Sequence, residues 1–267
     1  MNKNLKEIVL PIETKPAVVS RNIHAIHLSI IQKCDKQGIN YVYNNYIQLL
    51  FKTESSGHIT FDYIFPRYKN LSTLRTCSVD KPTFTINRIN IVIAYLNSYG
   101  NKSVDLIETV SYYHHRIEKE LITASLEDYI NSDNKSRLFD KSKWLEDNET
   151  FGIKTIEKIK LYLDDVINGR VYFDKRVMYT LMEHKRIMLE RYEHLLCNGI
   201  IGKDETLKKD LSEIYKKSCI GFNLYLKYLV SDNTSSLLKI DGVLDEIRDL
   251  EIKAIPRFID ALKKGVN

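Results

Sequence analysis

The chain has 267 residues, of which 43% are hydrophobic and 28% are charged, and its formal net charge at pH 7 is +5. This composition is that of an ordinary globular protein, and it excludes both a disordered chain and a coiled-coil rod. The 10 glycines and 5 prolines are too few for a loop-rich or many-stranded fold, and the length allows one large domain or two small ones.

The charge is unevenly distributed along the chain. Residues 1–100 contain 12 Lys and Arg against 6 Asp and Glu, whereas the rest of the chain is close to neutral. Surface cations favour acidic partners such as nucleic acid or an anionic protein. The alternative is that this excess, spread over many residues, serves only to keep the protein soluble.

The cysteines and the apolar segments indicate the cellular compartment in which the protein is expected. Cys34, Cys77, Cys197 and Cys219 have no CxxC spacing, which argues against a zinc knuckle or a redox dithiol. We expect them to be buried thiols in a reducing compartment. Because the N-terminal segment lacks the apolar stretch of a signal peptide, and no stretch is long and apolar enough to span a bilayer, we expect a soluble cytoplasmic protein without membrane insertion.

The first hundred residues contain the β-strand signals. Residues 7–19 are apolar and β-branched but contain two prolines, which predicts an extended arm or an edge strand. A helix is expected from Ser20 to Gly38. Two apolar runs, 46–52 and 58–65, flank a polar loop and predict a β-hairpin, and the segment after it, 85–100, fits either a short helix or a third strand.

The remaining residues have helical periodicity. Residues 103–131 carry apolar side chains at helical spacing, which predicts one long amphipathic helix. Further helices are expected at 154–168, 172–198, 204–231 and 236–264. Gly169 and Gly199 occupy the positions where a helix commonly ends in the left-handed conformation.

These elements predict an α-rich α+β fold: a small N-terminal region with a β-hairpin, followed by a bundle of four to five long helices. We assign residues 1–100 to a basic α+β region and residues 101–267 to the helical bundle. The alternative is one continuous domain, in which both parts share a core.

Residues 20–29, SRNIHAIHLS, are the closest approach to a catalytic motif. Arg21 and His27, with the polar Asn22, resemble the motif of the HEPN ribonucleases. The resemblance implies metal-independent RNA cleavage, in which His27 would handle the proton and Arg21 would stabilise charge on the phosphate. A histidine with a pKa near 6.5 can serve as general acid or base. His27 also falls on an apolar helix face, where a hydrogen-bonded core histidine is the alternative.

Metal and phosphate sites lack their usual patterns. The candidate ligands are Glu108, His114, His115 and Glu118 in one segment and Glu183, His184, Glu190 and His194 in another. Neither segment contains the Glu-x-x-His pair of carboxylate-bridged metal centres. Glu183, Lys185 and Arg186 are expected on a solvated face, and residues 199–206, GIIGKDET, lack the first glycine of a phosphate-binding loop. We therefore predict neither a metal nor a cofactor.

A second candidate is a surface that combines cations and aromatic rings. Between residues 61 and 88, basic side chains alternate with tyrosine and phenylalanine. Cations engage phosphates while aromatic rings stack on unpaired bases, which is how single strands are bound without sequence reading. The candidate nucleic-acid-binding residues are Arg67, Tyr68, Lys69, Arg75, Lys81 and Arg88.

The function that we predict is that of a non-enzymatic soluble protein that docks onto another protein, as an assembly component, adaptor or host-interaction factor. This prediction depends on the lack of catalytic motifs and on long helices, which can offer apolar surfaces to partners. The alternative is a protein that binds RNA or single-stranded nucleic acid, or a HEPN-like ribonuclease.

Overall fold

The structure is a computed structural model, and the chain in it divides into two compact units, one of Met1–Val42 with Tyr68–Ile117 and the other of Tyr43–Arg67 with Glu118–Asn267. The residues that it describes are 6–8, 43–44, 47–53, 56–64, 74–78, 84–86, 91–96, 103–109, 117–138 and 149–265.

The first unit contains a five-stranded sheet with the strand order β1-β5-β6-β7-β4, in which every pair is antiparallel. β1 is an edge strand, and it includes the first two residues of the segment 7–19, whose remaining residues lie outside the described part of the chain. The segment 85–100 contains strand rather than helix. The strands are β1 (Lys6–Ile8), β4 (Leu74–Ser78), β5 (Phe84–Ile86), β6 (Ile91–Leu96) and β7 (Ser103–Thr109).

The prediction of one helix over residues 103–131 is wrong at its N-terminal end. Residues Ser103–Thr109 form β7, which pairs with both β6 and β4, and the helix α3 covers only Lys119–Asn131. The spacing of the apolar residues in this segment is compatible with a helix as well as with a β-strand. Pairing with two neighbouring strands, which local periodicity does not report, decides between them.

The second unit contains the predicted β-hairpin. β2 (Gln48–Thr53) and β3 (Ile59–Ile64) are antiparallel, with Phe51 opposite Phe61, and β8 (Glu149–Phe151) pairs with the other edge of β2. Gly57 in the connecting loop has a positive φ of 79°, a conformation that glycine adopts at little cost. The hairpin belongs to the same compact unit as the C-terminal helices, since β8, which directly precedes them in the chain, pairs with β2.

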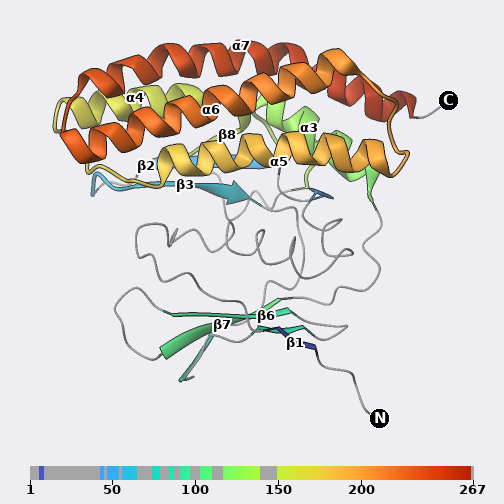
Figure 1. Cartoon of the computed structure of the whole chain (residues 1–267), viewed down its shortest axis with the longest axis horizontal. Coiled ribbons are helices and arrows are strands. Elements are labelled where there is room, and N and C mark those ends of the chain that lie inside the picture. Colours follow the sequence, from blue (N-terminus) through green and yellow to red (C-terminus); the bar gives the residue numbers. More distant parts are fainter. Residues whose placement is uncertain are drawn as a thin grey trace. The chain divides into compact units, whose positions relative to one another are not determined.

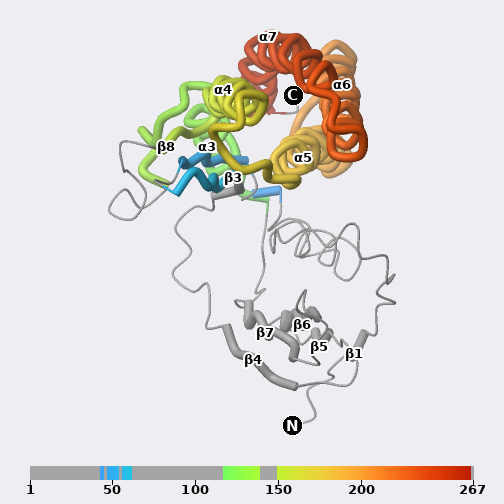
Figure 2. The backbone as a smooth tube through the Cα atoms, turned by 90° about the vertical axis from the view of Figure 1, so that its left-hand side faces the viewer, coloured from blue at the N-terminus to red at the C-terminus, as the bar shows by residue number. Residues whose placement is uncertain are grey.

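The four C-terminal helices lie close to their predicted positions. A short 3-10 helix, η3 (Gly152–Lys154), leads from β8 into α4, and Gly169 and Gly199, just past the ends of α4 and α5, have positive φ as expected. The helices, shown side by side in Figure 1 and nearly end-on in Figure 2, are α4 (Thr155–Ile167), α5 (Val177–Cys197), α6 (Glu205–Ser231) and α7 (Ser235–Lys264).

The core of the second unit lies between the helices and β2. Its side chains are aliphatic and aromatic, at helical spacing on each helix, and β2 is buried along its first four residues. This arrangement confirms the α-rich α+β fold. The domain boundary at residue 100 and the alternative of one shared core both stay predictions.

Candidate functional site

The residues predicted to act on nucleic acid lie almost entirely outside the described part of the chain. Of that set only Arg75 lies in a described element, β4, where its backbone is opposite Leu106 of β7. The ribonuclease and nucleic-acid-binding hypotheses therefore stay predictions. The residues outside the described part are Arg21, His27, Arg67, Tyr68, Lys69, Lys81 and Arg88.

The helix α5 carries charged side chains into the core of the second unit. Glu183 and Lys185 are buried, so the prediction that they lie on a solvated face is wrong. Lys185 continues the buried stripe of Leu181 and Met188, at a spacing of four and then three residues. The periodicity of the sequence thus indicated that Lys185 lies on the buried face, but lysine is rarely buried, so the residue was assigned to the surface.

Lys185 forms a buried ion pair with Glu251 of α7. Its Nζ donates to both carboxylate oxygens at 2.8 Å and to the hydroxyl of Tyr129 at 2.8 Å, and that hydroxyl donates to Glu251 at 3.0 Å. The Lys185 and Glu251 side chains are 0% and 1% exposed. The three hydrogen-bonded groups join α3, α5 and α7, and we call them the buried triad.

Burial shifts the protonation equilibria of the buried triad. Removal from water lowers the pKa of Lys185, an effect that Glu251 opposes, and burial raises the pKa of Tyr129 well above its ordinary value. Because Lys185 and Glu251 are at most 1% exposed, a substrate in solution does not touch the ion pair. The ion pair and Tyr129 connect three helices through hydrogen bonds.

Two further α5 side chains bind backbone carbonyl groups of the chain just before β2. His184 Nε2 donates to the Ile47 carbonyl at 2.6 Å, and Arg191 Nε donates to the Tyr43 carbonyl at 2.7 Å. Burial lowers the pKa of Arg191 to about 9. These carbonyl groups are thereby satisfied at the point where the chain enters the sheet, which fixes the hairpin against α5.

Below pH 6.5, the free energy of unfolding is expected to decrease as the pH is lowered, because of His184. Burial, and after it the positive charge of Lys185, lowers the pKa of His184 well below 6.5, so below that pH the unfolded chain binds a proton that the folded chain does not. One such proton contributes a slope of about 1.4 kcal/mol per pH unit. Urea unfolding of the wild type and of His184→Gln between about pH 6.5 and 5 measures this contribution as the difference in slope.

The half-buried His194, whose pKa burial also lowers, provides the comparison. His194→Gln is expected to reduce the slope less than His184→Gln does. A slope that His184→Gln leaves unchanged would mean that this imidazole titrates alike in the folded and unfolded chain.

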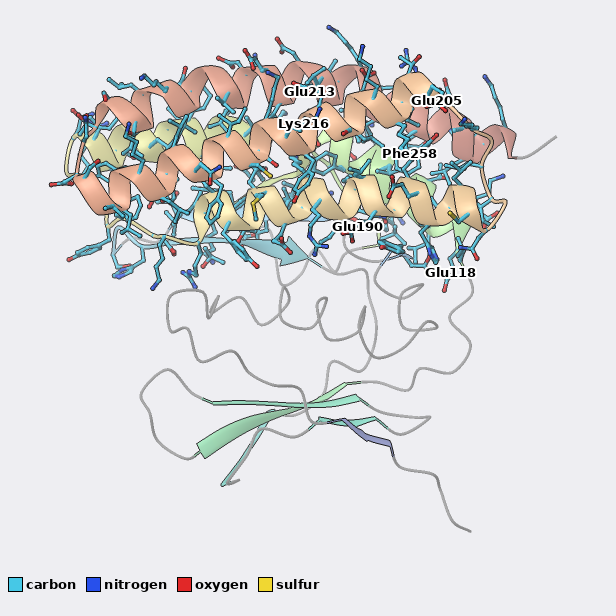
Figure 3. All side chains as sticks on the ribbon, viewed as in Figure 1. Glu118, Glu190, Glu205, Glu213, Lys216 and Phe258 are labelled. Atoms are coloured by element: carbon cyan, nitrogen blue, oxygen red, sulfur yellow. The ribbon has the colours of Figure 1, made fainter. Side chains whose placement is uncertain are left out.

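A second ionic cluster, which is partly buried, lies on α5. Arg186 binds Glu183 at 2.9 Å and also binds Glu190, which is labelled in Figure 3. Glu190 in turn accepts a hydrogen bond from the Tyr43 hydroxyl at 3.4 Å. The ring of Tyr43 lies near that of His194 in a tilted arrangement, with centroids 4.8 Å apart. The carboxylates that were considered as metal ligands are therefore bound by a guanidinium group.

The first group of candidate metal ligands is largely untested. Glu108 lies in β7, while His114 and His115 lie outside the described residues. In the part of the chain that the structure describes, no three His, Cys, Asp or Glu side chains are grouped so that they could hold a metal ion. Of the two cysteines whose surroundings are described, Cys197 is exposed rather than buried as expected, and Cys219 is partly buried.

The outer surface of the bundle carries an exposed apolar group where α6 ends and α7 begins. We call it the apolar end. It consists of Leu226, Leu229 and Val230 of α6 and Leu238 of α7, which are 38%, 50%, 88% and 63% exposed. On α6 the three side chains occupy positions i, i+3 and i+4, which are neighbours on a helix surface. A loop of three residues, 232–234, joins the two helix ends.

The exposure of these side chains follows from the geometry of α6. Its buried stripe, which includes Leu211, Ser218 and Tyr225, faces the core. Leu226 and Val230 stand off that stripe. In the sequence, this part of the helix is an apolar run, YLKYLV, that is wider than one helix face.

No protein-family model matches the chain, and neither the curated proteins nor the solved structures contain a match. Among the helices described, none is long and apolar enough to cross a membrane.

Proposed function

We propose that this protein is a non-enzymatic docking protein that binds another protein through the apolar end, as an assembly component or adaptor. The observation that carries the proposal is the exposure of Leu226, Leu229, Val230 and Leu238 at one end of the bundle. Single exposed apolar residues are normal on a protein surface. Several that adjoin on one helix, with another at the start of the next, mark an interaction site.

The physical argument is the cost of leaving apolar side chains in water. Burying a leucine or valine side chain that is otherwise exposed contributes about 1.5–3 kcal/mol, so a partner that covers the apolar end gains from each of its members. Binding energy at interfaces is concentrated in a few such central side chains. The α6 helix, anchored by its buried stripe, presents three of them, and α7 presents Leu238.

A photo-crosslinking amino acid at Val230 tests this proposal. In extracts of the cells that make the protein, it is expected to give one discrete crosslinked product, because Val230 is the most exposed member of the apolar end. Leu229→Asp, introduced into the same chain, is expected to weaken that crosslink about tenfold or more, since a carboxylate would be desolvated in the interface.

The matched control is Leu161 of α4, an exposed leucine that is 59% exposed and lies outside the apolar end. The crosslinker placed there is expected to give no discrete product, and Leu161→Asp is expected to leave the Val230 crosslink unchanged. Equal products from both positions, or a Val230 crosslink that Leu229→Asp does not affect, would contradict the proposal.

A further inference from the structure

Lysines flank the apolar end, and no acidic side chain in the described part of the chain forms an ion pair with them. Lys227 lies between Leu226 and Val230 in the sequence of α6, and Lys239 follows Leu238 in α7. Both lysines are exposed, and no described acidic side chain lies within ion-pair distance of either of them. Each helix thus carries an exposed positive charge close in sequence to its exposed apolar side chains.

Acidic side chains of the same two helices, among them Glu213 and Asp241, are in contrast paired with lysines of the protein itself. Glu213 lies 3.7 Å from Lys217 and 3.9 Å from Lys216. Figure 3 labels Glu213 and Lys216, which lie about one turn apart on α6. Asp241, the acid nearest to Lys239 in α7, lies 3.4 Å from Lys160 of α4. The charge left over around the apolar end is therefore positive.

Asp232, which ends α6, is the remaining acid at this position. Burial, and after it the charge of Asp232, raises the pKa of Tyr228, one turn earlier on α6. Asp232 is exposed and lies in the loop between the two helix ends. A densely anionic lipid surface laid over the apolar end would be repelled by Asp232, whereas a peptide can place its acids beside the lysines alone.

From this pattern we infer that the partner segment at the apolar end is an acidic amphipathic helix of another protein, with apolar side chains that cover Leu226, Leu229, Val230 and Leu238 and with Asp or Glu side chains that pair with Lys227 and Lys239. The inference rests on the proposed docking function and specifies the chemistry of its partner. Complementary charge sets orientation and partner choice, while the apolar contacts supply most of the affinity.

Two fluorescent peptides of about 18 residues test the inference on the full chain. Both carry leucines at i, i+3, i+4 and i+7, but one has glutamates and the other has lysines at the flanking positions. Fluorescence anisotropy is expected to show that the wild type binds the acidic peptide about tenfold or more tightly than the basic one. Added salt is expected to narrow this difference, because exposed charges are screened.

The charge reversal Lys227→Glu with Lys239→Glu is expected to invert the preference, so that the basic peptide binds more tightly. The same reversal at Lys158 of α4 and Lys253 of α7, two exposed lysines away from the apolar end, is the matched control and is expected to leave the preference as in the wild type. An inverted preference cannot come from misfolding, since an unfolded chain would lose affinity for both peptides.

Other outcomes separate the inference from the proposed function. If both peptides bind equally well and Leu229→Asp abolishes this binding, the inference of an acidic partner is wrong, but the apolar docking site stands. Binding of phosphatidylserine vesicles in place of either peptide would overturn the inference in favour of a lipid surface. If neither peptide binds and the Val230 crosslink is absent as well, both the inference and the docking function fail.

Discussion

Replacement of Glu251 by glutamine is expected to lower the free energy of unfolding by about 3–5 kcal/mol, because it leaves the charge of Lys185 buried without a counter-charge. Glutamine keeps the shape of the side chain, so the effect reports the charge rather than a cavity. Lys185 Nζ is completely buried and has two of its three hydrogen bonds to this carboxylate. Urea unfolding followed by circular dichroism measures the loss as a lower midpoint.

The pH dependence of the Glu251→Gln variant has a definite sign. Without the carboxylate, the pKa of Lys185, which burial already lowers from 10.5, falls further. Between that lowered pKa and 10.5 the unfolded chain holds a proton that the folded chain lacks, so stability rises with pH. The deficit of the variant is therefore expected to narrow as the solution becomes alkaline.

Two comparisons make this prediction specific. Glu127→Gln removes the acid of an exposed ion pair with Lys263, at 2.6 Å, and is expected to leave the unfolding midpoint nearly unchanged. The double substitution Lys185→Met with Glu251→Leu is expected to recover most of the loss, because no charge remains to be buried. A loss as large for Glu127→Gln as for Glu251→Gln would show that the buried position of the triad is not what matters.

Replacement of Gly152 by alanine is expected to destabilise the protein by about 2–4 kcal/mol. Gly152 has a positive φ of 59°, and a Cβ there would lie 2.2 Å from the carbonyl oxygen of Tyr129. That oxygen belongs to the backbone at the end of α3, which can retreat only by moving the helix that carries the tyrosine of the buried triad. Thermal unfolding measures the effect as a lower Tm.

Gly169 provides the matched control for Gly152. It has a similar φ of 67°, but nothing lies within 4 Å of the position that a Cβ would take. Gly169→Ala therefore reports the cost of the left-handed conformation alone, about 1 kcal/mol. The difference between the two variants isolates the contact with Tyr129, and equal losses would show that this contact is absent in solution.

The elements that sequence reasoning located are those whose signals are local. The loop at Gly57 separates two apolar runs, and it connects β2 to β3 as expected. Gly169 and Gly199 end their helices because glycine adopts a positive φ without steric cost. Such features depend on a few consecutive residues, so they can be recognised without knowledge of the rest of the fold.

The errors arose where a residue's neighbours come from distant parts of the chain. Residues 103–109 form a strand because two other strands pair with them. Lys185 is buried because Glu251, 66 residues later, neutralises it there. Neither partner is visible from the periodicity of the segment itself, which reports only which side chains share a face.

By itself, the amino-acid sequence determined the class of the fold, the β-hairpin and the succession of the C-terminal helices, since backbone conformation follows largely from local residue preferences and spacing. The tertiary structure alone decided which of the apolar and charged side chains are buried. It placed Lys185 inside and Val230 in water, because burial depends on which elements pack together, and α6 extends its apolar run beyond the face that its neighbours cover.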